Sequence, residues 1–111
     1  MNIEFELKPP HAIFHFEGKL GFTELAGIRS KLNPILREKK YKIIFDLKEL
    51  ESIDSSGVAL LFHVAQEATL YKDGSFVLTA PGEFVKEVMV LSGIYNKFII
   101  HNSLEEAIRL N

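Results

Sequence analysis

The stretch Ile53-Asp54-Ser55-Ser56-Gly57-Val58 decides how this chain is interpreted. The apolar run at 43–47 before it predicts a buried strand, and the apolar spacing i, i+3, i+4 and i+7 after it predicts a helix. Between them, Asp54, Ser55 and Ser56 carry short side chains whose oxygens accept hydrogen bonds from the free N–H groups of a first helical turn. Two serine hydroxyls are therefore expected at the positive end of a helix dipole, where a phosphate group is favoured.

Gly57 is unusual at this position. With Asp54 as the N-cap, Gly57 would be the third helical residue, where glycine costs about 0.8–1 kcal/mol relative to alanine. A missing side chain beside an exposed hydroxyl indicates that something approaches the backbone closely there. In the alternative interpretation, Asp54, Ser55 and Ser56 only cap the helix and Gly57 is incidental, since Ser and Asp are ordinary N-cap residues. The residues alone leave both interpretations open.

The first half of the chain predicts a hairpin and a helix. Apolar residues alternate with polar ones at 3–7 and again at 12–16, and Pro9-Pro10 between them predicts a turn. His11 and His15 are placed on the polar side of the second strand, at a solvated edge. From Phe22 to position 36 the apolar spacing becomes helical, and Pro34 is expected to kink or divide that helix.

The second half predicts two further strands and three helices. The helix after Ser56 is expected to reach about Tyr71, followed by a strand at 75–80 and a helix at 81–92 that Gly93 ends. A last strand at 97–101 precedes a terminal helix that opens with a capping box, Ser103 to Glu106. An opening hairpin followed by alternating helices and strands predicts an α/β fold. We expect a single domain at 1–111 with a mixed, mostly parallel sheet packed against about four helices.

Composition and charge exclude several classes of function. The net charge of −2 and the pI near 6.1 disfavour a nucleic-acid partner, which would require clustered Lys and Arg. The chain has no cysteine, and no apolar run is long enough to cross a membrane. We therefore expect a cytoplasmic protein that binds no nucleic acid and does not insert into a membrane.

Catalytic and metal chemistry are also disfavoured. On a strand, His11 and His15 would stand about 13 Å apart at ~3.3 Å per residue, which excludes chelation of one metal by the pair. The serine stretch lacks the Gly-x-Ser-x-Gly pattern of a hydrolase nucleophile, and no phosphate loop or dinucleotide fingerprint is present. We expect no enzymatic activity, no metal and no cofactor.

The strand, the sequence I-D-S-S-G and the apolar helix together resemble the signature of the STAS domain. The chain is most similar to the bacterial anti-sigma-factor antagonists, and the preceding run Ile43-Ile44-Phe45-Asp46-Leu47 also matches their pattern. The resemblance covers essentially the whole length and implies a STAS-like fold. It also implies phosphorylation of Ser56, the serine directly before the glycine.

The resemblance further implies a set of partners. Unphosphorylated, the protein would bind an anti-sigma factor that is itself a serine kinase, and phosphorylation of Ser56 by that kinase would release it. A metal-dependent serine phosphatase would restore the hydroxyl. The expected contact surface comprises Asp54, Ser55, Ser56, Gly57 and Gly21; Gly21 stands where the family commonly has an aspartate, in the run Gly-x-Leu-Asp.

A second function is compatible with the same resemblance. The chain would then be a constitutive STAS scaffold, such as a subunit of a lipid-transport ATPase or of a signalling assembly, in which Ser56 is only a helix cap. Phosphorylation could not control such a scaffold.

Overall fold

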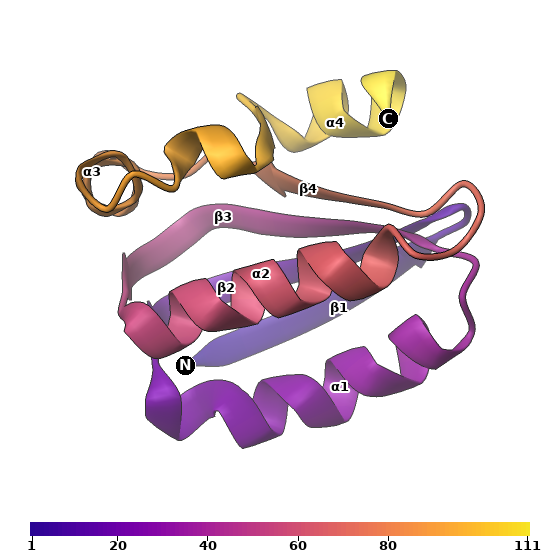
Figure 1. The fold of residues 1–111 in the computed structure, drawn as a ribbon, viewed down its shortest axis with the longest axis horizontal. Helices are drawn as coiled ribbons and strands as arrows, with labels where there is room; N and C mark the ends of the chain where they lie inside the picture. The colour runs from indigo at the N-terminus through magenta and orange to yellow at the C-terminus, as the bar shows by residue number, and fades with distance from the viewer.

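Nine regular elements and two short 3₁₀ turns make up the computed structural model, which describes residues 1–111 (Figure 1). The strands are β1 (Asn2–Lys8), β2 (His11–Leu20), β3 (Lys42–Ile53), β4 (Ser75–Thr79) and β5 (Ile99–His101). The helices are α1 (Leu25–Arg37), α2 (Ser55–Ala68), α3 (Glu83–Leu91) and α4 (Leu104–Leu110), and the 3₁₀ turns are Phe22–Glu24 and Tyr95–Lys97.

The sheet has five strands in the order β1-β2-β3-β4-β5. β1 and β2 form an antiparallel hairpin around the Pro9-Pro10 turn, and β2 to β5 are parallel to one another. Each parallel connection carries a helix, as such connections require. The predicted α/β class, the N-terminal hairpin and the mostly parallel sheet are confirmed.

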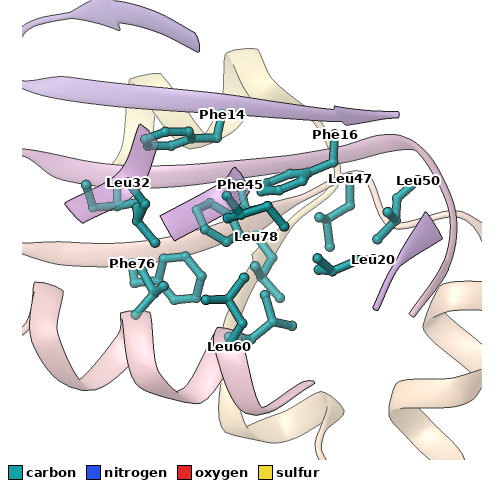
Figure 2. Packing of buried hydrophobic residues seen from close by; sticks show 14 of the residues in the cluster. Phe14, Phe16, Leu20, Leu32, Phe45, Leu47, Leu50, Leu60, Phe76 and Leu78 are labelled. Atoms are coloured by element: carbon teal, nitrogen blue, oxygen red, sulfur yellow. The ribbon is translucent and has the colours of Figure 1, made fainter. Parts of the chain in front are cut away.

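The hydrophobic core lies mainly on one face of the sheet. α1 and α2 cover this face, and α3 contributes Val85 and Met89 to the same cluster (Figure 1). Phe45, at the centre of the sheet, contacts the rings of Phe14, Phe16 and Phe76 at centroid distances of 4.7–5.7 Å. Figure 2 shows these side chains pointing into the space between the sheet and the helices.

A smaller cluster occupies the opposite face. It contains Ile13, Ile44 and Val77 from three neighbouring strands, covered by Ala107 of α4. The strands in the middle of the sheet are therefore buried on both faces, which explains the continuous apolar runs in their sequences.

β3 is longer than the sequence indicated, because it continues beyond Leu47 to Ile53. Its register against β2 shifts twice, between His15 and Glu17 and again between Gly18 and Lys19, and each shift adds one residue to β3. These bulges interrupt the two-residue alternation, so that Leu47, Leu50 and Ile53 are all buried at a spacing of three. A prediction that relies on strict alternation of buried and exposed residues therefore ends the strand at the first bulge.

The first helix also differs from its prediction. α1 runs through Pro34 without being divided, and it begins only at Leu25, after the 3₁₀ turn. Phe22, which the spacing placed in the apolar stripe, is 75% exposed. α2 ends at Ala68, three residues before the predicted end. The Ser103 cap of α4 is confirmed, since its hydroxyl accepts a hydrogen bond from the Glu106 N–H at 3.1 Å.

The predicted solvated edge for His11 and His15 is wrong, because β2 lies between β1 and β3 and is not an edge strand. His11 is buried, with its Nε2 3.2 Å from the carbonyl oxygen of Asn111. His15 is half-buried and pairs with Asp46, its Nδ1 lying 2.8 Å from Oδ2. Each side chain has at least one hydrogen-bond partner within the domain.

Tyr71 links the end of α2 to the start of β3, and we expect its loss to weaken the domain. Its hydroxyl donates to the Tyr41 carbonyl oxygen at 2.5 Å, and burial raises the pKa of the phenol above its ordinary value of 10.0. The stability that the protonated Tyr71 hydroxyl contributes is therefore complete below pH 10. It falls as the pH rises through the higher pKa of the phenol in the folded state. Tyr71→Phe should lower the free energy of unfolding at neutral pH by about 1 kcal/mol and remove that alkaline loss.

Urea unfolding at pH 7 and above pH 10 measures both effects. Tyr95→Phe is the control, since no hydrogen bond of that hydroxyl to the protein is seen. Equal stability of the Tyr71→Phe variant and the parent protein at pH 7 would contradict the assigned role.

Candidate functional site: the start of helix α2

The start of α2 lies at the carboxyl end of β3. Ile53 is the last residue of the strand and Asp54 is the N-cap, with extended backbone angles of φ −107° and ψ −175°. One carboxylate oxygen of Asp54 accepts a hydrogen bond from the Gly57 N–H at 3.0 Å, and the Asp54 carbonyl accepts one from Val58 at 2.9 Å. The predicted N-cap is confirmed.

The two serines occupy the first two helical positions and do not make the cap. Ser55 is exposed and Ser56 is half-buried. Because Asp54 alone satisfies the Gly57 N–H, the idea that Ser56 serves as the helix cap does not describe this structure. The local fold therefore leaves both hydroxyls available for other chemistry.

Gly57 is buried, and the close approach that its sequence position indicated comes from within the domain. A Cβ atom there would lie 2.7 Å from the Leu20 carbonyl oxygen, 2.7 Å from Cγ1 of Ile53 and 2.9 Å from Cγ of Leu20. Cβ atoms essentially never come so close to other heavy atoms. The glycine lets the first turn of α2 pack onto the ends of β2 and β3, so it supports the site from beneath instead of facing a partner.

Gly21 is brought to the same place from a distant part of the sequence. The Asp54 N–H donates to the Leu20 carbonyl at 3.1 Å, which fixes the turn after β2 beside the start of α2. A Cβ on Gly21 would lie 2.6 Å from Oδ2 of Asp54 and 3.5 Å from Oε1 of Glu24. Any side chain at position 21 therefore requires the Asp54 carboxylate to move.

A shallow groove of about 310 Å³ follows this junction. Its lining includes Lys19 and Ser52 from the strand ends, Phe22 and Glu24 from the 3₁₀ turn, and Asp54. Phe22 adds a large exposed apolar side chain next to Gly21. Phe22 and Glu24 were not among the predicted site residues, because helical spacing assigned Phe22 to the core; the pair Gly21-Phe22 after a strand was the available signal for a turn.

The groove has the features of a binding surface. No histidine lines it, and nowhere does the structure group three or more His, Asp or Glu side chains as metal ligands. The exposed aromatic ring of Phe22 lies among polar groups, and protein contact sites are enriched in aromatic side chains surrounded by a polar rim. As a separate finding, no helix of the structure combines the length and hydrophobicity needed to cross a bilayer.

The packing at Gly57 predicts opposite effects for the same substitution in two helices. Gly57→Ala should lower the free energy of unfolding by about 1–3 kcal/mol, because overpacking against Leu20 outweighs the better helix propensity of alanine. Gly27→Ala in α1 should raise it by about 0.5–1 kcal/mol, since no atom lies within 4 Å of the added Cβ. Chemical denaturation of the two variants measures both values. A stabilising Gly57→Ala change would refute the close packing at this junction.

The sequence also matches a known protein family. The family model for the STAS domain matches residues 2–107. No curated protein sequence is similar enough to this chain to give a match.

Several solved structures share the fold over almost the whole chain. The anti-sigma factor antagonist SpoIIAA in its unphosphorylated form is 25% identical with a TM-score of 0.80, covering 96% of this chain and 93% of its own. A putative anti-sigma factor antagonist from Thermotoga maritima is 20% identical with a TM-score of 0.86, covering 96% and 92%. The phosphorylated form of SpoIIAA from Bacillus is 21% identical with a TM-score of 0.74, covering 99% and 100%.

The family model spans nearly all of the sheet and helices described above, including the strand–serine–helix junction. The chain belongs to the STAS domain family.

Proposed function

We propose that this protein is an anti-sigma-factor antagonist controlled by phosphorylation of a serine at the start of α2. The observation that carries the proposal is the arrangement of the first turn of α2. Asp54 caps the helix, and the hydroxyls of Ser55 and Ser56 are left free. The similarity to SpoIIAA, solved in both phosphorylated and unphosphorylated forms, supports a switch of this kind.

The two serines differ in their access to an enzyme. The sequence motif predicts Ser56 as the phosphorylated residue, and Ser56 is half-buried. Ser55 is exposed, so accessibility favours Ser55 as the acceptor. The two hydroxyls are adjacent on the same turn, and the electrostatic consequence of a phosphate is similar at either one.

A phosphate on this turn would change association more than folding. It adds about −1.5 to −2 charges at neutral pH, next to the carboxylate of Asp54. N–H groups of the first turn offset part of this charge, so the domain does not need to unfold. A partner surface that accepts a neutral hydroxyl would have to bury an unpaired dianion, and each ~1.4 kcal/mol of that penalty weakens binding tenfold.

The partners follow from the same switch. The unphosphorylated protein binds an anti-sigma factor that is also a serine kinase, and transcription is regulated indirectly by this exchange of partners. A metal-dependent serine phosphatase reverses the modification. ATP and metal belong to those partners, the protein itself catalyses no reaction, and the exchange takes place in the cytoplasm.

The contact surface is the groove at the start of α2. Asp54 and Gly21 line it together with Phe22, whose exposed ring is the largest apolar group there, and Ser55 follows Asp54 directly in the sequence. Gly21 removes the side chain that many relatives have at this point, and the Asp54 carboxylate fills part of that space. The recognition of the partner therefore depends on Asp54 and Phe22.

Mass spectrometry of the protein isolated from its native cells tests the modification directly. We expect a single phosphate in the peptide that contains Ser55 and Ser56, and fragment ions then identify the residue. A constitutive scaffold would carry no phosphate on this peptide under any growth condition, and that result would exclude the switch.

Binding of variants to the anti-sigma factor kinase of the same organism tests the mechanism. Ser55→Ala and Ser56→Ala should bind within about threefold of the parent protein, whereas an Asp at the phosphorylated position should bind at least about tenfold more weakly. Gln66→Glu, an exposed change in the same helix with the same added charge, should bind normally. Equal binding of Ser55→Asp, Ser56→Asp and the parent protein would favour the scaffold function, in which the charge of this turn has no role.

A further inference from the structure

β1 forms an open edge of the sheet. Its seven residues pair with β2 on one side, and no strand lies on the other. The Ile3 carbonyl accepts a hydrogen bond from Nζ of Lys31 in α1 at 3.3 Å, so it points away from β2. Because alternate residues of a strand direct their backbone groups to the same side, the N–H and C=O groups of Phe5 and Leu7 also face the open edge.

The same edge exposes apolar side chains. Phe5 and Leu7 are each 43% exposed, although they lie on the face of the sheet that α1 and α2 cover. The Phe5 ring rests on Phe14 at a centroid distance of 5.0 Å, so its outer side remains uncovered. Open edges of this kind are templates for pairing with another strand.

Charged side chains on the other face of β1 determine which strand can pair with the open edge and in which register. Glu4, Glu6 and Lys8 point to that face, opposite to Phe5 and Leu7. An antiparallel second copy that placed Phe5 opposite Phe5 would set Glu4 against Glu6, and like charges directly opposite are destabilising. In a shifted register, Phe5 of each copy lies opposite Leu7 of the other copy. Glu4 of each copy then lies opposite Lys8 of the other, which gives two pairs of opposite charges.

We propose that two copies of this chain associate through β1 in that shifted register, joining their sheets into one. Each Phe5 then lies opposite Leu7 of the second copy, and about four backbone hydrogen bonds close the two pairs. Glu6 lies opposite Glu6 of the second copy, where Nζ of Lys8 at 3.5 Å in each copy offsets the charge and Nε2 of His15 lies 3.4 Å from the carboxylate. The strand is complementary to itself, as a two-fold interface requires.

The interface involves only one strand from each copy, so the dimer should be weak and reversible. The start of α2 contributes no residue to the pairing, which involves only β1. Self-association and partner binding through the groove can therefore be tested separately.

Sedimentation equilibrium over a range of protein concentrations tests the proposal. The parent protein should dimerise at high concentration, and Glu4→Lys and Lys8→Glu should each weaken dimerisation about tenfold by creating two like-charge pairs. The double variant, Glu4→Lys with Lys8→Glu, should restore dimerisation to within about threefold. Glu87→Lys on exposed α3 makes the same change in net charge as Glu4→Lys and should have no effect.

A weaker dimer of Glu4→Lys is the decisive result, because the substitution brings the net charge from −2 to zero, a change that by itself would promote unspecific association. A parent protein that stays monomeric at its solubility limit, or a double variant as weak as the single ones, would overturn the proposal. Hydrogen exchange gives a test without substitutions: the Phe5 and Leu7 amides should become more protected as the concentration rises. Protection that appears only when a different protein is added would show another occupant and refute self-pairing.

Discussion

The structure of the candidate site depends on one close contact between backbone and backbone. The first turn of α2 rests on the end of β2, where the Leu20 carbonyl accepts the Asp54 N–H and also lies against Gly57. This contact joins two segments that are more than 30 positions apart in the sequence, and it brings Gly21 and Phe22 next to the serines. A side chain at position 57 would separate them, so the glycine determines the shape of the surface without being part of it.

The two carboxylate oxygens of Asp54 make different contacts in this arrangement. Oδ1 accepts the hydrogen bond that begins the helix, and Oδ2 occupies the space in front of Gly21. A single carboxylate thus satisfies the end of a helix and supplies negative charge to the groove. The helix dipole favours that charge at its N-terminus, so the free domain stabilises the carboxylate that the surface presents.

Much of the fold could be predicted from the sequence, because its elements follow regular periods. The hairpin, the apolar core strands and the Ser103 cap each leave a local pattern, and all of them are confirmed. The bulges in β3 were not predictable, since an extra residue in one strand shows only when its partner is known. The burial of His11 depends on Asn111, 100 positions away, and no local pattern contains that contact.

The site was predictable in its chemistry and less so in its surroundings. The motif identified Asp54 as the cap and placed two serines on the first turn, because these residue types satisfy free N–H groups. It assigned Gly57 to the surface, since the sequence cannot distinguish a glycine that admits a partner from one that admits the domain's own backbone. The helical spacing of apolar residues from position 22 onward placed Phe22 in the core, because the 3₁₀ turn before α1 has the same apolar spacing as a helix.

The separation of the cap from the hydroxyls has a consequence for how such domains evolve. Because Asp54 alone begins α2, either serine can be replaced by alanine, threonine or a larger residue without removing the bond that holds the turn. A domain that lost both hydroxyls would therefore keep the same first turn and the same neighbouring backbone. Substitutions at positions 55 and 56 can alter the chemistry of this surface without altering the fold that presents it.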